Sequence, residues 1–205
     1  MAIMKQYGPM LLRGTGMTLL ISLVGTLVGF IIGLLVGIIR TTPKPKKLGQ
    51  RGLRAVINWL LSVYIEVFRG TPMIVQAAVL YYGAAQAWHL NMDRTTAALL
   101  IVSINTGAYI SEIIRGGIIS VDEGQFEAAN ALGMTHLQTM MKVILPHAVG
   151  NSRPAVTNEF IVNIKDTSVL SVISVSELFF SGETIAGQSF QFFHTYLIVS
   201  GIYLI

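Results

Sequence analysis

The residues best suited to chemistry are charged side chains within segments that are otherwise apolar enough to lie in a membrane. Glu159 and Asp166 are seven positions apart, about two helical turns, so a helix here carries both carboxylates on one face. Charges at membrane depth cost about 2.5–3.5 kcal/mol each and are functional by default. Both acids are therefore candidate binding groups, and the alternative is an internal pair with Arg69 or Lys165 that serves only packing.

A second set of candidates surrounds a predicted helix break in EVFRGTPM, Glu66 to Met73. Pro72 lacks a backbone donor and clashes with the preceding turn, so Gly70-Thr71-Pro72 interrupts the helix. A broken helix is tolerated at membrane depth only where it lines a cavity or is buried in protein. Arg69 is the charged candidate at this break, and Glu66, three positions earlier, is its nearest competing partner.

The third feature is a polar hairpin at about 116–150, which contains EAANALGMTHLQTMMKVILP. Gly133 fits the left-handed stop of a first short helix. Thr135 and Gln138 predict a capping box that opens a second helix, and Pro146 marks where that helix ends or kinks. A hairpin this compact is suited to being moved as a rigid body by a partner, and a simple connector is the alternative.

Several other chemistries are disfavoured by the composition. The chain has no cysteine, so it has neither disulfides nor thiolate metal sites. Its four histidines form no HExxH or comparable cluster, and there is no GxxxxGK[ST] loop for ATP. Ser171, Ser174 and Ser176 cluster, but no histidine stands in a recognisable relation to them, which argues against a membrane-embedded enzyme.

The elements that must position these residues are predicted to be membrane helices. The 205 residues are 53% hydrophobic and 12% charged, about half the charged fraction of soluble domains. Thr18 to Ile39 holds 22 uncharged residues, enough to cross a hydrocarbon core of about 30 Å and too long for a signal peptide. Further spans are expected at about 56–82, about 95–114, from 151 into the 160s, and at 191–205.

Two segments have particular expectations. TSVLSVISVSELFFSGETIAGQ, after the fourth span, is too polar for a full crossing and is expected to be short or re-entrant. The last apolar run is still in progress at Ile205, so we expect the native chain to continue.

In the first span, small residues at a spacing of four predict close packing of another helix; they are Gly25, Gly29, Gly33 and Gly37.

The distribution of basic residues predicts the orientation. A cluster beside the first span is typical of a cytoplasmic loop, which places the N-terminus outside and the polar hairpin inside. The cluster consists of Arg40, Lys44, Lys46, Lys47, Arg51 and Arg54.

The motif Glu127-Ala128-Ala129, Gly133, Leu145-Pro146, with Val143 where isoleucine is usual, resembles the EAA loop of ATP-binding-cassette (ABC) import permeases. LLRGTGMTL, EVFRGTPMIVQ, GAYISEIIRGG and NEFIVNIKDTSVLSVI resemble the polar amino-acid uptake subfamily. The resemblance implies an all-α membrane protein with the type I ABC importer permease fold. One permease domain, 1–205, would hold about five transmembrane helices and a cytoplasmic coupling helix.

The resemblance also implies the roles of the candidates. In the polar hairpin, Glu127 would contact an ATPase, Ala128 and Ala129 would permit close packing, Gly133 would make the turn, and Pro146 would close the motif. ATP and Mg would be bound by that separate subunit, so this chain would be a non-catalytic permease without a cofactor.

The implied substrate site lies near the middle of the membrane. Glu159 and Asp166 would hold a cationic side chain or an α-ammonium, which favours arginine, lysine or histidine as substrate. Arg69 would face the α-carboxylate, with Thr71 and Gln76 as neutral donors and help from free N–H groups at the helix break.

The expected function is import of polar, basic amino acids by alternating access in a prokaryotic inner membrane. The implied partners are ATPase subunits, a second permease copy or a sister permease, and an extracellular or periplasmic binding protein. The alternative is a secondary transporter that uses the same acids as a proton relay. It predicts uptake without ATP and leaves the polar hairpin unexplained.

Overall fold

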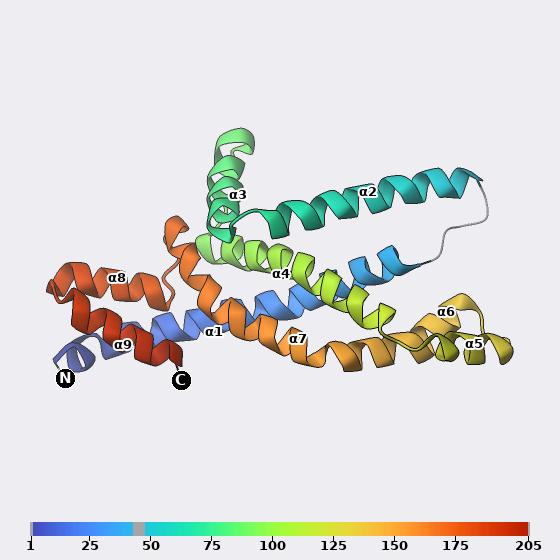
Figure 1. Ribbon diagram of the computed structural model, residues 1–205. Coiled ribbons are helices and arrows are strands. Elements are labelled where there is room, and N and C mark those ends of the chain that lie inside the picture. Colours follow the sequence, from blue (N-terminus) through green and yellow to red (C-terminus); the bar gives the residue numbers. More distant parts are fainter. Residues whose placement is uncertain (1, 43–47, 205) are drawn as a thin grey trace.

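The computed structural model describes residues 2–42 and 48–204, and all regular structure in these ranges is helical (Figure 1). The helices are α1 (Ala2–Thr41), α2 (Leu48–Gly70), α3 (Met73–Trp88), α4 (Arg94–Ile119), α5 (Glu123–Ala131), α6 (His136–Thr139), the π-helix η1 (Met140–Ile144), α7 (Leu145–Asp166), the 3-10 helix η2 (Thr167–Ile173), α8 (Leu178–Ser189) and α9 (Phe192–Leu204). The predicted all-α fold is confirmed. Outside the described residues lie Lys44, Lys46 and Lys47 of the predicted inside loop, and Ile205.

The described helices supply two to four membrane crossings. Ile3–Thr41 and Arg94–Ile119 are each long and apolar enough to cross alone. Two bent pairs, Gly49–Gly70 with Met73–Ala87 and His136–Ile173 with Leu178–Ser189, add a crossing each if a pair counts as one span. The fifth expected span, at 191–205, coincides with α9, an apolar helix of 13 residues. It is shorter than the roughly 20 residues that a crossing needs and is not among these two to four crossings.

Helix α1 begins much earlier than the apolar run that predicted it. It comprises 40 residues, roughly 60 Å at 1.5 Å per residue, and Pro9 does not interrupt it. The additional turns are stabilised by packing, because Ile3 and Leu11 join a buried cluster with Ile185 of α8 and Val199 of α9. These tertiary contacts extend the helix beyond the limit that hydropathy alone predicted.

The glycine spacing in α1 predicted close packing correctly, and the partner is α4. A Cβ on Gly33 would lie 2.7 Å from the Ile110 side chain, whereas ordinary contacts are 3.4–4 Å. The same construction on the other three glycines gives 2.4–2.9 Å, from Gly25 to Val102, from Gly29 to Thr106 and from Gly37 to Ile114. The contacts step along both helices every four residues, so the glycines form a continuous seam.

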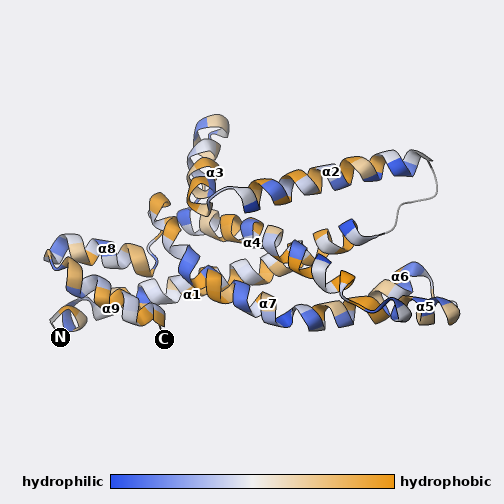
Figure 2. Cartoon of the chain, viewed as in Figure 1, coloured by the Kyte–Doolittle hydropathy of each residue, from blue (hydrophilic) through white to orange (hydrophobic). Residues whose placement is uncertain are grey.

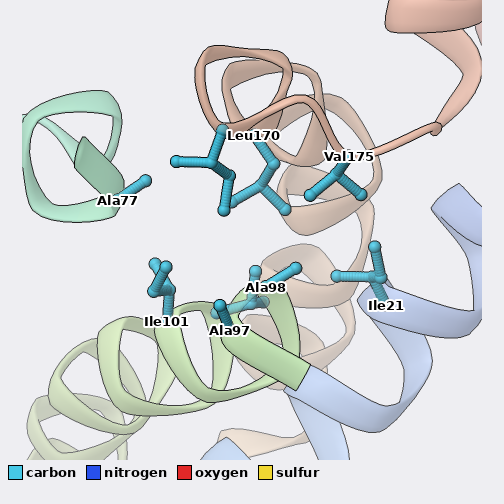
Figure 3. Packing of buried hydrophobic residues seen from close by; sticks show 9 residues of the cluster. Ile21, Ala77, Ala97, Ala98, Ile101, Leu170 and Val175 are labelled. Atoms are coloured by element: carbon cyan, nitrogen blue, oxygen red, sulfur yellow. The ribbon is translucent and has the colours of Figure 1, made fainter. Parts of the chain in front are cut away.

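The polar elements are arranged around this apolar frame. One buried cluster, with Ile21, Ala77, Ala98 and Leu170 among its members, holds α1, α3, α4 and η2 together (Figure 3). Hydrophilic residues recur along α7 (Figure 2). The α5–α6 end of the polar hairpin lies at the opposite end of the molecule from the N-terminus, α8 and α9 (Figure 1).

Candidate functional site

The predicted helix break is present and is held by side-chain amides. Helices α2 and α3 meet at an angle of 113°. The Gln76 amide donates to the carbonyls of Phe68 and Thr71 and to the Thr71 hydroxyl, each at 2.9 Å. Asn105 of α4 donates to Gln76 at 2.8 Å and to Phe68 O at 3.2 Å. Carbonyls that lose their helical partners at the break thus gain side-chain donors, as buried polar groups require.

These bonds change what can be expected of Gln76. Its side chain is buried, and both ends of its amide are occupied by groups of this chain. Thr71 is exposed, and its hydroxyl donates to Val67 O at 2.8 Å. The break therefore leaves Thr71 more accessible than Gln76.

Arg69 lies at the exposed end of α2, beside the break. Its guanidinium carbon stands 5.4 Å from the ring centroid of Tyr109, close enough for a cation–π contact. No ion pair joins it to Glu66 within the described part of the chain. Arg69 is also near enough to act electrostatically on Glu112 of α4 and on Glu159 of α7.

Both predicted acids lie on α7, and neither forms an ion pair with Arg69 or Lys165 in residues 2–42 and 48–204. Glu159 is half-buried and Asp166 is exposed at the end of the helix. The two carboxylates are close enough to interact electrostatically. Their charge is therefore not consumed by the internal pairing that the packing alternative requires.

Asn163 lies between the two acids and is only 2% exposed. Its amide donates to Thr26 Oγ1 of α1 at 2.9 Å and to Thr106 Oγ1 of α4 at 3.0 Å. Sequence analysis gave Asn163 no role. Its place between the two acids, one helical turn from each, is the signal that could have identified it.

A cluster of charged residues near the C-terminal end of α4, formed by Glu112, Arg115 and Arg40 of α1, has a structural role. Glu112 accepts from Arg40 of α1 and from Arg115, the latter at 2.8 Å, and Arg40 also reaches Ser62 of α2. The group joins three helices beside the polar hairpin.

The buried acid Glu177 was missed by sequence analysis. It is fully buried and caps α8 by accepting from the backbone N–H groups of Phe179 at 2.8 Å and Phe180 at 2.6 Å. Thr18 of α1 and Tyr203 of α9 also donate to it. An acid directly before Leu-Phe-Phe was the available signal, although Glu is not among the residues preferred at this position.

The polar hairpin has the predicted turn chemistry. Gly133 has φ +73°, in the left-handed region, and Thr135 and Gln138 form the expected capping box. Before Pro146 the backbone widens into the π-helix η1 and continues into α7. A π turn accommodates the missing donor and the bulk of the proline ring, so the helix bulges instead of ending.

The exposed side chains of the polar hairpin form a mixed polar and apolar surface. Glu127 and Ala128 are exposed, whereas Ala129 is buried within the chain. Leu132 and Leu137 are 82% and 70% exposed. The base of the hairpin is fixed to the bundle by a buried cluster that joins α4, η1 and α7.

The described helices form an apolar bundle with a broken helix pair beside α4 and an exposed hairpin at one end (Figure 1), an arrangement suited to a membrane transport subunit. The family model of the binding-protein-dependent transport system inner membrane component matches residues 29–205, and the chain belongs to this family. It is therefore a non-catalytic permease of the polar amino-acid ABC transporters. The ion-driven transporter considered as an alternative is set aside by this membership.

Relatives support the same conclusion. The chain is 39% identical over 198 residues to the glutamine transport system permease GlnP of Escherichia coli (strain K12), covering 96% of this chain and 86% of the relative. It is 42% identical over 150 residues to the L-cystine transport system permease TcyB of Bacillus subtilis (strain 168), covering 73% of this chain and 64% of the relative. The crystal structure of an amino acid ABC transporter with histidines matches with a TM-score of 0.83 at 36% identity, over 98% of this chain and 89% of that one.

Proposed function

We propose that this permease takes up basic amino acids, with arginine, lysine or histidine as substrate. The observation that carries the proposal is the pair Glu159 and Asp166, two carboxylates on one face of α7 without an ion-pair partner among the described residues. Fixed negative charge favours a cationic ligand in a medium of low dielectric constant. The relatives leave the substrate open, because their names give glutamine and cystine and the related structure was determined with histidines.

In this proposal the two ends of the substrate meet different elements. Glu159 and Asp166 bind the cationic side chain or the α-ammonium group. Arg69 binds the α-carboxylate, and the Thr71 hydroxyl contributes a neutral contact. The first turn of α3 has no side-chain cap, so its N–H groups and positive dipole end also favour an anionic group here. Gln76 acts indirectly, by holding the break in shape.

The polar hairpin is the proposed coupling element. Glu127 and Ala128 contact a cytoplasmic ATPase subunit, and Gly133 and the capping box keep the hairpin rigid, so movement of the ATPase drives alternating access. Ala129 and Pro146 support the hairpin from within. ATP and Mg are bound by the ATPase. A second permease copy or sister permease and an extracellular or periplasmic binding protein complete the importer, with the N-terminus outside and the hairpin in the cytoplasm.

The experiment is uptake of arginine and glutamine by the assembled importer in proteoliposomes. A hydrogen bond to a charged group contributes about 1.5–3 kcal/mol, so Glu159→Gln is expected to reduce the preference for arginine over glutamine by about 10- to 100-fold. Glu183→Gln, a change at an exposed acid on α8, is the matched control and keeps the preference. An unchanged preference in Glu159→Gln would overturn the basic-substrate proposal.

A further inference from the structure

Two neighbouring residues of α4, Asn105 and Thr106, hydrogen-bond to different parts of the proposed site. Both are buried, at 6% and 0% exposure. Asn105 binds the α2–α3 break, and Thr106 binds α7. The proposed site has two halves, one with Arg69 and Thr71 at the break and one with Glu159 and Asp166 on α7. Because Asn105 and Thr106 are adjacent, both halves are hydrogen-bonded to the same turn of α4.

The hydrogen bonds of Asn105 fix the half of the proposed site that contains Arg69 and Thr71. Asn105 donates to Gln76 Oε1 at 2.8 Å and to Phe68 O at 3.2 Å, the carbonyl directly before Arg69. One turn further along α4, Tyr109 lies under the Arg69 guanidinium. The position of the break along α4 is therefore set by an amide, and the direction of Arg69 by a ring on the same helix.

The hydrogen bonds of Thr106 fix the half that contains the acids. Thr106 and Asn163 exchange hydrogen bonds at 3.0 and 3.2 Å, and Thr26 of α1 accepts from the same amide at 2.9 Å. Asn163 is four residues after Glu159 and three before Asp166, hence on the same face of α7. Its bonds set both the height and the rotation of that face.

The buried side chains of Asn105, Thr106 and Asn163 need not be polar for the helices to pack stably. A buried amide or hydroxyl is costly unless it is paired, and replacing both partners by apolar groups of similar shape can be nearly neutral for stability. What polar pairs add is a defined register, because a shift of either helix leaves buried donors and acceptors without partners. Close packing of α1 on α4 does not need the hydroxyl, because Gly29 meets the Cβ and Cγ2 atoms of Thr106.

We propose that Asn105 and Thr106 are positioning residues that fix the separation between the Arg69–Thr71 half and the Glu159–Asp166 half, and thereby select substrates by the length of their side chain. This inference rests on the proposed function. A site that holds a carboxylate at one end and a cation at the other at a fixed separation discriminates against homologues that are too short. In such a site, one methylene group changes the affinity for the substrate by about 10- to 200-fold.

The experiment measures binding to the purified permease–ATPase complex in lipid nanodiscs, without the binding protein. Labelled arginine is displaced by lysine, ornithine and 2,4-diaminobutyrate, which shorten by one methylene at each step. In the wild-type complex, the affinities for successive members of this series are expected to differ by at least about tenfold. In Asn105→Leu and Thr106→Val the separation is expected to fall below about threefold, a third of that lower bound.

Two further variants isolate the cause. Ser103→Ala removes a buried hydroxyl that donates to Leu99 O within the same helix, and it is expected to keep the length preference. Thr106→Ser retains the hydroxyl, and it is also expected to keep the preference. If Asn105→Leu does not assemble, Thr106→Val against Thr106→Ser decides the question.

Equal loss of affinity for all ligands in the variants, with the length preference intact, would overturn the inference, because that is the behaviour of a merely structural residue. A wild-type complex that binds arginine without preference among the lengths would overturn it too. Failure of the wild type to bind any cationic amino acid would overturn the proposed function instead. Glutamine against asparagine, which also differ by one methylene, would then test the same two residues.

Discussion

The glycine seam between α1 and α4 makes a quantitative prediction about helix packing. In Gly33→Ala the new Cβ would lie 2.7 Å from Ile110 Cβ and 2.8 Å from the backbone nitrogen of Ser111. One of these neighbours is backbone, so the two helices must separate by a substantial fraction of an ångström. Overpacking of this kind costs about 1–3 kcal/mol.

The same substitution at Gly16 provides the matched control. Gly16 lies in α1, and a Cβ there meets no atom within 4 Å. Replacing a helical glycine by alanine contributes about 1 kcal/mol of helix propensity at either position, so the difference between the two variants isolates the packing term. At about 2–4 °C per kcal/mol for a chain of this size, Gly33→Ala is expected to unfold roughly 2–12 °C below Gly16→Ala.

The assay is thermal unfolding of the detergent-purified chain. The folded protein that remains at each temperature is measured by size-exclusion chromatography. A Gly33→Ala variant that unfolds at the same temperature as Gly16→Ala, or above it, would refute the account of the seam. The helices would then be separable at no cost, and the four-residue glycine spacing would have no packing role.

Two further predictions concern the caps of helices in the described part of the chain. Thr135→Ala removes the capping box of α6, at a cost of about 1 kcal/mol, and is expected to speed hydrogen exchange at the Gln138 amide about fivefold, whereas Thr135→Ser leaves it slow. No change in that exchange rate would mean that the box does not stabilise the hairpin. Glu177→Ala exposes the uncapped N–H groups of α8 and leaves the hydroxyls of Thr18 and Tyr203 without their acceptor, so it is expected to lower the unfolding midpoint by several degrees at about 1–3 kcal/mol. Glu177→Gln keeps an acceptor and should lose less, and equal losses would contradict the capping role.

Local sequence rules predicted those parts of the fold that local chemistry determines. The Gly70–Pro72 break, the left-handed Gly133 and the Thr135–Gln138 capping box all depend on residues within a few positions of one another. The glycine seam was also predictable, since small residues on one helix face leave room for a neighbour. Only the identity of that neighbour, α4, required the structure.

Features that depend on distant parts of the chain were beyond local reasoning. The first turns of α1 are held by α8 and α9, which the hydropathy of the first forty residues does not report. Gln76 was identified as a donor, but its partner Asn105 is 29 positions away, and so its use in the break could not be foreseen. Glu177 is bonded to Thr18, 159 positions earlier in the chain.

The substrate candidates illustrate the same division. The one-face relation of Glu159 and Asp166 follows from helical spacing, whereas their lack of ion-pair partners among the described residues depends on where Arg69 and Lys165 point. Arg69 was expected to have Glu66 as a competitor, and it instead lies over Tyr109 on another helix. Packing between helices thus decided which charges are available at the candidate site.

The most direct test of the central account is a mild-detergent purification of this chain from its native membrane, with nucleotide present. We expect an ATPase with a Walker motif to co-purify stoichiometrically, and to be lost when Glu127 and Gly133, exposed residues of the polar hairpin, are replaced together. A matched change at exposed Glu183 of α8 should leave the complex intact. Recovery of the folded chain without any ATPase, across several detergents, would contradict the proposal that the polar hairpin couples ATP hydrolysis to transport.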